Sequence, residues 1–383
     1  MPVRTLIYLD NNATTPLAPS VIEAMSESLE RFGNPSSAHS EGKQARDVVD
    51  RARGSVAAFI GAASPSAVIF TSGGTESDNW AILGALESQP GKDHVVTTRV
   101  EHEAVRKLCE KLEQKGARVN WIDVDEHGRL DLDQLRGSID ENTAIVSVML
   151  ANNETGVVFP VEEIAEIVKQ RSGALFHVDG VNAAGKIPID LKKTKIDLFS
   201  LSAHKFHGPK GIGVLYIRDG VDLPALQIGG GQEFGRRAGT EAVHQIAGIG
   251  AAAEYARDLT PVEKVRELRD LLESSILEST TNATVNGDVK ARLPNTTNIS
   301  FENMNGEMIL HYLDEAGICV STGSACNSES RTSSPVLAAM NVPFSKAMGS
   351  IRFSLSRMNE SKEIDSTIEN LKGVIEKLKR ISG

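Results

Sequence analysis

The chain has 383 residues, of which 40% are hydrophobic and 24% charged, and its formal net charge is −10. This composition is that of a globular protein and excludes a disordered chain, and the length suffices for two or three domains. The acidic balance argues against nucleic acid or an anionic membrane as the main partner. No apolar run approaches the roughly 18–20 residues of a membrane span, and Arg4 and Asp10 interrupt the stretch where a secretory signal would lie.

The three cysteines, Cys109, Cys319 and Cys326, form no CxxC pair. An odd number of cysteines without paired spacing argues against a disulfide scaffold and against a four-cysteine zinc site. This cysteine usage fits a reducing compartment. We therefore expect a cytoplasmic globular enzyme without a resident metal ion.

Short apolar runs alternate with helical patterns between about residues 67 and 217. We predict helices at 76–86 and, from apolar residues at helical spacing, at about 161–168. This alternation is typical of an α/β fold whose mostly parallel sheet is covered by helices on both faces. The strands that we predict are 67–70, 94–98, 119–124, 144–150, 174–178, 198–201 and 213–217.

The pattern changes after about residue 258. Thr260, Pro261 and Glu263 have the types and spacing of an N-cap, a first helical residue and a capping-box partner. Short strands are predicted over 298–301, 318–321 and 351–355, followed by a final helix with apolar residues from Ile364 to Leu378. We expect two domains, a large one over 15–258 and a smaller α+β domain over 259–383 that residues 1–14 join.

A Gly-Gly turn lies between the first predicted strand and its helix. The two glycines turn the chain and Thr75 stands where the helix begins, and the free N–H groups and the helix dipole at such a position suit a phosphate. The segment matches neither the dinucleotide motif GxGxxG nor the ATP motif GxxxxGK[ST]. The alternative is an ordinary strand-to-helix turn with a threonine cap.

Polar residues follow two further predicted strands. Asp179 ends one of them, where its carboxylate could pair with a protonated ring nitrogen or cap the next turn. Lys205 follows the next strand, where burial would lower the pKa of its amine and suit it to a Schiff base; the alternative is a surface lysine in a Gly/Pro loop. His204 and His207 form an HxxH pair, but no third ligand is evident, so a metal site is not predicted.

The phosphate cradle, Asp179 and Lys205 all lie at the carboxyl ends of strands of one predicted sheet. A phosphate site, a partner for a pyridinium nitrogen and a lysine for a Schiff base are what a pyridoxal 5′-phosphate (PLP) enzyme needs. Their joint occurrence favours PLP chemistry over three separate structural explanations.

Three other residues extend this candidate site. His102 opens a predicted helix, where a neutral imidazole could stack on a cofactor ring and move protons, or only cap the helix. Cys326 lies in a polar segment, unlike the other two cysteines, and is therefore the candidate reactive thiol. Arg352 lies on the polar face of its predicted strand, where it could hold a substrate carboxylate or simply be exposed.

These residues belong to motifs that follow one another along nearly the whole chain. In the motifs the chain resembles the cysteine desulfurases, within the class V group of PLP-dependent enzymes, and above all their nitrogen-fixation and iron–sulfur-assembly branch. The motifs are 8–15 (YLDNNATT), 32–36 (FGNPS), 71–77 (TSGGTES), 101–102 (EH), 151–156 (ANNETG), 177–179 (HVD), 202–205 (SAHK), 235–240 (GRRAGT), 323–326 (GSAC) and 351–354 (IRFS).

The resemblance implies the PLP-dependent transferase fold of fold type I, with a seven-stranded sheet in the large domain and the reactive cysteine on the small one. It also implies a homodimer, because one subunit would contribute to the phosphate site of the other. By resemblance, Lys205 would hold PLP, whose phosphate would be bound by Gly74, Thr75, Ser202 and His204 and by Thr240 of the neighbouring subunit. Asp179 would pair with the ring nitrogen, His102 would stack on the ring, and Asn153 and Asn182 would lie near the ring oxygen. Arg352, with Asn34, would bind the substrate carboxylate.

The reaction implied is the removal of sulfur from L-cysteine. Lys205 would take the Cα proton, Cys326 would attack the substrate sulfur, and L-alanine would leave a persulfide on Cys326 for an iron–sulfur scaffold or another acceptor. Cys326 could also ligate an iron–sulfur cluster transiently during transfer. The family usually has glutamine where this chain has Asn182, which puts the contact with the ring oxygen in question.

Alternative functions that the same residues allow are those of a selenocysteine lyase, a cysteine-sulfinate desulfinase or a small-amino-acid transaminase. A non-catalytic sulfur carrier on the same fold is a further alternative. The presence of Lys205, Asp179, His102 and Cys326 together favours the desulfurase.

Overall fold

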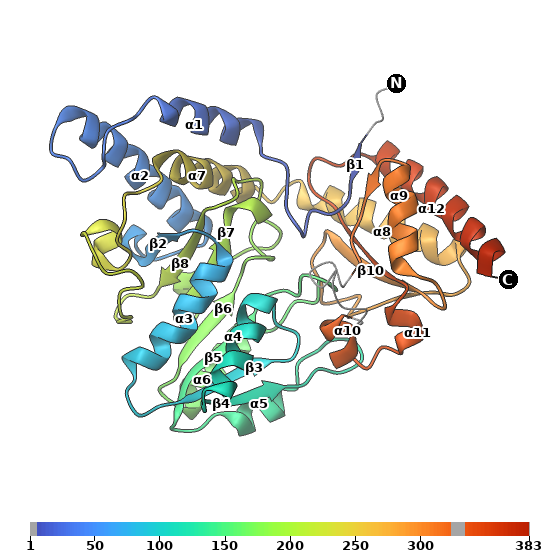
Figure 1. The fold of residues 1–383 in the computed structure, drawn as a ribbon, viewed down its shortest axis with the longest axis horizontal. Coiled ribbons are helices and arrows are strands. Elements are labelled where there is room, and N and C mark those ends of the chain that lie inside the picture. The colour runs from blue at the N-terminus through green and yellow to red at the C-terminus, as the bar shows by residue number, and fades with distance from the viewer. Residues whose placement is uncertain (1–5, 323–333, 383) are drawn as a thin grey trace.

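The computed structural model of the chain describes residues 6–322 and 334–382. Its larger part is built on a seven-stranded sheet, and a smaller part contains a three-stranded and a two-stranded sheet (Figure 1). The order in the large sheet is β2 (Val68–Thr71), β8 (Gly213–Ile217), β7 (Leu198–Ser202), β6 (Leu175–Asp179), β5 (Thr143–Met149), β3 (His94–Thr98) and β4 (Arg118–Ile122).

The large sheet is mixed, because β8 runs antiparallel to both of its neighbours while the other paired strands are parallel. The prediction of a mostly parallel sheet is thus confirmed. The ends of each predicted strand lie within two residues of the ends of the observed strand. The strands are apolar along their length because both faces of the sheet are covered.

Successive residues of the strands contribute to two different hydrophobic clusters. Ile145 packs with the cluster that includes Trp80 and Val105, whereas Val146 packs with the cluster that includes Ile164. Helices α3 (Gly74–Ser88) and α4 (Glu103–Gln114) therefore cover one face of the sheet. The other face is covered by helices that include α2 (Ser40–Phe59), α6 (Val161–Arg171) and α7 (Val243–Arg257).

The smaller part has a hydrophobic core of its own. Strands β9 (Ala283–Val285), β10 (Thr296–Phe301) and β12 (Ser350–Ser354) form its antiparallel sheet, and β1 (Ile7–Tyr8) pairs with β11 (Ile318–Cys319). Ile7 and Leu9 lie in the same core as Phe301 and Phe353, so the beginning of the chain packs against its C-terminal third (Figure 1). The helices of this part are α8 (Val262–Ser279), α9 (Gly306–Glu315), α10 (Pro335–Ala339), α11 (Phe344–Ala347) and α12 (Ser361–Ser382).

The remaining helices are α1 (Pro19–Leu29) and α5 (Leu132–Ser138), with short 3-10 turns η1 (Pro65–Ala67), η2 (Leu191–Lys193), η3 (Ala203–Lys205) and η4 (Gln232–Gly235). Within the described residues, none of the helices has the length and apolar character needed to cross a membrane.

The predicted capping box at the start of α8 is wrong. The helix begins at Val262 with Pro261 as its N-cap, and no side chain caps it. Asp258 instead accepts a hydrogen bond from the Thr260 N–H at 2.9 Å. The turn before the helix thus satisfies the Thr260 backbone and leaves the threonine outside the cap.

A buried ion pair fixes the loop after β8 to the core. Arg53 of α2 binds Glu233 through two hydrogen bonds of 2.7 Å, and the same carboxylate accepts from the Phe70 N–H at 2.8 Å. Both side chains are less than a tenth exposed, and Glu233 has a φ of +46°, which L residues rarely adopt. The ion pair therefore holds a strained turn in place.

We expect Glu233→Gln to lower the free energy of unfolding by about 3–5 kcal/mol, because the Arg53 charge would stay buried without a counter-charge. Urea unfolding of the variant and the wild type measures this. The matched control is Glu166→Gln, which removes an exposed pair with Lys195 and is expected to cost less than about 1 kcal/mol. Equal losses in the two variants would contradict the prediction.

Candidate active site

A cavity of about 360 Å³ lies where the carboxyl ends of β5, β6 and β7 meet the smaller part of the molecule. Asp10, Asn12, Ser321 and Thr322 also line it, so segments far apart in the sequence share its wall. The predicted site residues in its lining are Gly74, Thr75, His102, Asn153, Asp179, Asn182, Ser202, His204, Lys205 and Arg352.

Among the described residues, two predicted site residues do not line the cavity, and a third predicted residue lies outside the described part of the chain. Asn34 is exposed, and its side chain accepts a hydrogen bond from the Ser36 N–H. Thr240 is also exposed, as a residue that reaches a neighbouring subunit would be. Cys326 lies outside the described residues, although Thr322 before that segment and Pro335 after it both line the cavity.

The start of α3 forms one end of the cavity. A Cβ atom on Gly74 would lie only 2.7 Å from a methyl group of Val181, so glycine alone fits between the helix and this neighbour. Thr75 follows in the first turn of this 15-residue helix, and Ser202 and His204 reach the same cavity from the end of β7. Backbone N–H groups, hydroxyls and an imidazole here are suited to hold a phosphate.

Three buried carboxyl groups gather at the inner end of the cavity. Asp179 ends β6 and accepts a hydrogen bond from the Val181 N–H at 2.9 Å, and Asp78 and Glu101 also line the cavity. Burial raises the pKa of Asp179, and burial together with the Asp179 charge raises that of Asp78 well above its usual range. Asp78 Oδ1 and Glu101 Oε2 make no hydrogen bond within the described residues. This acidic, unsatisfied end fits a cationic group such as a protonated pyridine nitrogen.

Both ring nitrogens of His177, two residues before Asp179 in β6, lie within hydrogen-bond distance of serine hydroxyls. Nδ1 lies 2.8 Å from Ser147 Oγ and Nε2 lies 2.9 Å from Ser200 Oγ. Burial lowers the pKa of His177 to about 3, so the ring is neutral. This histidine braces β6 against its neighbouring strands.

His102 caps α4 and faces the cavity at the same time. Its Nδ1 accepts the Ala104 N–H at 3.2 Å, which leaves Nε2 on the other side of the ring. Burial, more than any charge, lowers the pKa of His102. The imidazole is therefore neutral near pH 7, as a ring that stacks on a cofactor or takes up a proton must be. Both functions proposed for His102 from the sequence are compatible with this position.

Lys205 lies in η3, directly after β7. Its Nζ donates hydrogen bonds to the carbonyl oxygens of Asn12 at 2.5 Å and Ala13 at 3.1 Å. The N-terminal segment thus orients the amine beside the cavity. The His204 carbonyl oxygen accepts the Thr15 N–H at 2.9 Å, which ties the same segment to η3.

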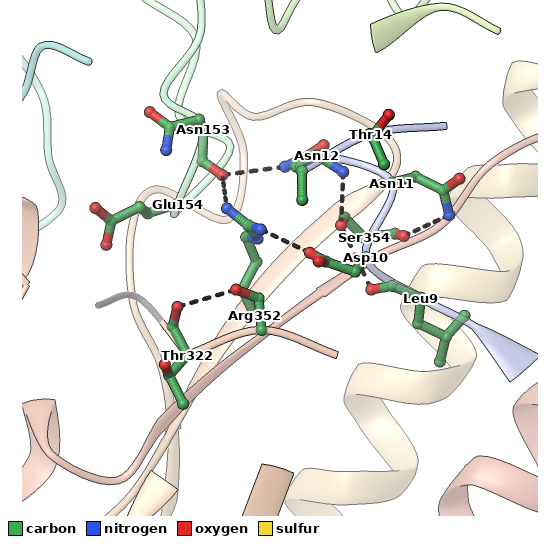
Figure 2. Close-up of polar contacts among 12 residues, drawn as sticks. Leu9, Asp10, Asn11, Asn12, Thr14, Asn153, Glu154, Thr322, Arg352 and Ser354 are labelled. Atoms are coloured by element: carbon green, nitrogen blue, oxygen red, sulfur yellow. Dashed lines mark hydrogen bonds and ion pairs between the residues drawn. The ribbon is translucent and has the colours of Figure 1, made fainter. Parts of the chain in front are cut away.

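Arg352 of β12 lines the same cavity and is buried between Asp10 and the backbone of Asn153 (Figure 2). Nη2 lies 2.7 Å from Asp10 Oδ1, and Nη1 donates to the Asn153 carbonyl oxygen at 2.9 Å. The Asn12 side chain donates to the same carbonyl oxygen. Nε has no partner within the described residues. The guanidinium group is thus held in one orientation with donors remaining for a carboxylate.

Four residues of the cavity wall, Asp10, Asn12, Asp78 and Glu101, were not predicted as site residues. Asp10 and Asn12 lie within motif 8–15, Glu101 lies within motif 101–102, and Asp78 directly follows motif 71–77. Their only signal was a polar side chain next to an apolar strand or turn. That signal is shared by many surface residues and so did not distinguish them.

The buried Glu101 gives a pH-dependent prediction for the cofactor-free protein. Burial raises the pKa of this carboxyl from 4.5 to about 8, so folding favours its protonated form. Its contribution to stability is complete below pH 4.5 and is lost as the pH rises to 8. We therefore expect Glu101→Gln to gain stability relative to wild type over this range, measured by urea unfolding at a series of pH values.

The exposed Glu87 offers the control for this experiment, because Glu87→Gln removes an acid of the same kind from the surface. Its stability relative to wild type is expected to stay constant between pH 4.5 and 8. A Glu101→Gln protein that tracks the wild type across the range would refute the assignment of a protonated Glu101.

Comparison with known proteins places this chain in a large family of enzymes. Residues 7–367 match the family model of the class V aminotransferases. A cysteine desulfurase from Nostoc sp. is 51% identical over 99% of this chain and 95% of its own length. The cysteine desulfurase NifS of Azotobacter vinelandii is 48% identical over 98% of this chain and 94% of its own.

Solved structures agree with the sequence relatives. A NifS-like protein superposes with a TM-score of 0.92 at 39% identity, over 98% of this chain and all of its own. SspA, solved in complex with cysteine, superposes with a TM-score of 0.82 at 35% identity, over 92% of this chain and 99% of its own. The fold is therefore the fold type I of PLP-dependent enzymes, as the resemblance implied.

Proposed function

Since this chain belongs to the aminotransferase class V family, and within it to the cysteine desulfurases, we propose that it uses PLP in the cavity described above and receives the sulfur of L-cysteine on Cys326. One observation carries the proposal. A lysine, a buried acidic end, a neutral histidine and a helix N-terminus all face one cavity. Each has another explanation alone, but together they match the functional groups of PLP one by one.

The residues present fit PLP at both ends. Gly74, Thr75, Ser202 and His204 would hold the phosphate, and Asp179 would keep the ring nitrogen protonated at the acidic end. His102 would lie against the ring, and Asn153 and Asn182 near its oxygen. When bound, PLP supplies an electron sink for the bonds broken at the substrate Cα, which no side chain can provide.

The substrate is held and deprotonated by residues of the chain itself. Arg352 would bind the α-carboxylate through the donors that Asp10 and Asn153 leave unused. Lys205, oriented by the carbonyl groups of Asn12 and Ala13, would remove the Cα proton. His102 would accept the proton of the substrate thiol at Nε2, since Nδ1 is engaged by Ala104.

The sulfur transfer is a nucleophilic displacement at sulfur. The Cys326 thiolate would attack the substrate sulfur, so that an S–S bond forms and the substrate C–S bond breaks. The electron pair of the broken bond goes to the substrate carbon, which takes up a proton and leaves as L-alanine. The persulfide on Cys326 then passes to an acceptor, for which an iron–sulfur scaffold is the proposed class, with transient cluster ligation by Cys326 as a further possibility.

A homodimer is part of the proposal. Thr240 follows a loop in which Ile228 is 97% and Phe234 is 60% exposed, and a second copy would cover these apolar side chains. We also propose that residues 15–258 form the large domain and that residues 1–14 join 259–383 in the small one, as the separate core around Phe301 and Phe353 supports. A cytoplasmic location is proposed from the cysteine usage.

The test is an absorbance spectrum of the purified protein, followed by the yields of L-alanine and sulfide from L-cysteine with a reductant. We expect a band of lysine-bound PLP and equal yields of the two products. A colourless protein that stays inactive with added PLP would reject the proposal. Turnover of selenocysteine without turnover of cysteine would identify a selenocysteine lyase instead.

A further inference from the structure

Lys186 is a buried amine that the reaction described above does not use. The residue is only 9% exposed. Nζ donates to the carbonyl oxygen of Asn182 at 2.7 Å and to Asn182 Oδ1 at 3.0 Å. Both of these hydrogen bonds end on one residue of the cavity wall.

The Asn182 amide is held from two sides. While Lys186 donates to its oxygen, its nitrogen Nδ2 donates to the Asn152 carbonyl oxygen at 3.2 Å. A flipped amide would set its oxygen against that carbonyl oxygen, so the orientation is determined. One Nδ2 hydrogen remains, and Asn182 lines the cavity.

The backbone around this pair is also fixed. A Cβ atom on Gly180 would lie 1.9 Å from the ring of Phe199, so the chain after β6 is packed directly against this ring. The Ala183 and Ala184 N–H groups both donate to the Gly180 carbonyl oxygen at 3.1 Å. The resulting helical turn places Lys186 four residues after Asn182, on the same side.

We propose that Lys186 is a positioning residue that turns the Asn182 amide so that its nitrogen donates to the ring oxygen of bound PLP. The inference rests on the proposed function and deepens it. Asparagine is one methylene shorter than the glutamine usual at this position. Its reach is therefore limited, and a second anchor is needed to present the donor in the right direction.

The charge of Lys186 is consistent with this role. Burial, followed by the nearby charges of Lys205 and Arg352, lowers the pKa of its amine well below the usual range. A lowered pKa favours the neutral form of the amine, and the amine donates to Asn182 in either protonation state. Lys186 can therefore orient the amide without competing with Lys205.

The consequence is measurable in the absorbance of the PLP-loaded protein, without turnover. The ring oxygen and the nitrogen that links PLP to lysine share a proton, and a donor to the oxygen favours release of that proton. Losing the donor should therefore raise the pKa of the linkage. We expect Lys186→Met to raise it by about half a unit to one unit, the worth of one hydrogen bond.

Asn182→Ala and the double variant show whether Lys186 acts through Asn182. We expect Asn182→Ala to raise the pKa of the linkage by at least as much as Lys186→Met. Adding Lys186→Met to Asn182→Ala should then change nothing further. A full additional shift in the double variant would mean that Lys186 acts on the cofactor directly, and would overturn the proposal.

Two further variants test whether a shift in the pKa of the linkage reflects the lost hydrogen bond or a general loss of stability. Lys186→Gln retains a donor near Asn182 and should give a pKa between those of wild type and Lys186→Met, even if Lys186→Met folds poorly. Lys169→Met removes a lysine that binds Asp197 away from the cavity, and should lower stability without moving the pKa.

The outcomes separate the inference from the function on which it rests. A wild-type protein without the band of lysine-bound PLP would overturn both. A wild-type band whose pKa is the same in Lys186→Met, Lys186→Gln and Asn182→Ala would overturn the positioning role alone.

Discussion

Lys205→Ala is expected to abolish both the absorbance band of lysine-bound PLP and the turnover of L-cysteine. The residue has two functions in the proposed reaction, since it links the cofactor to the protein and removes the Cα proton. Proton transfer by a positioned side chain alone contributes about 10²–10⁴-fold to a rate. We therefore expect kcat/KM to fall by more than about 10³-fold, measured as L-alanine formed with PLP in excess.

The neighbouring Lys210 provides the matched control, because it is an exposed lysine five residues further along the same loop. Lys210→Ala should keep both the band and the activity. The urea midpoint of Lys205→Ala should stay near that of wild type, because its amine donates to backbone carbonyl oxygens at the edge of the cavity. Retained turnover in Lys205→Ala would mean that another amine performs the chemistry.

Cys326→Ala is expected to lose desulfuration of L-cysteine while it still binds PLP. Without this thiolate nothing described in the cavity attacks the substrate sulfur, because Cys109 is buried and burial raises the pKa of its thiol to about 12. We expect L-alanine formation to fall by at least about 10²-fold, within the range that loss of a catalytic nucleophile gives. The change in absorbance on adding L-cysteine should persist.

Selenocysteine distinguishes a missing nucleophile from a damaged site. Selenium leaves carbon more easily than sulfur, so Cys326→Ala should lose less activity on selenocysteine than on cysteine. Cys319→Ala is the control, since this half-buried thiol has a pKa raised by burial and should not contribute. Undiminished sulfide release from Cys326→Ala would remove Cys326 from the reaction and favour a lyase mechanism.

The strands of the large sheet could be predicted closely because their signal is local. The predicted bounds 94–98 and 213–217 agree with the observed strands at both ends, since each segment is a short run rich in β-branched or other apolar residues between polar turns. The direction of β8 could not be predicted in this way. An apolar run has the same composition in either direction, and the antiparallel pairing of β8 depends on the chain that connects it to β7.

The start of α8 shows the limit of local rules at a helix end. Thr260, Pro261 and Glu263 fit the pattern of a capped start, but the helix begins one residue later than this pattern requires. A cap contributes about 1 kcal/mol, which a neighbouring turn such as that of Asp258 can outweigh. Helix boundaries therefore depend on which local hydrogen bond prevails in the folded chain.

By itself the sequence determined the fold class and most of the candidate site, because glycine turns, a strand-end carboxylate and a strand-end lysine each require particular residue types at short spacing. The tertiary structure decided which distant side chains complete the site. Asp10 pairs with Arg352 across 342 positions, and Asn12 reaches both Lys205 and Asn153. Such contacts follow from how the two parts of the molecule pack. The local sequence around a polar residue does not indicate which distant residue it will contact in the folded protein.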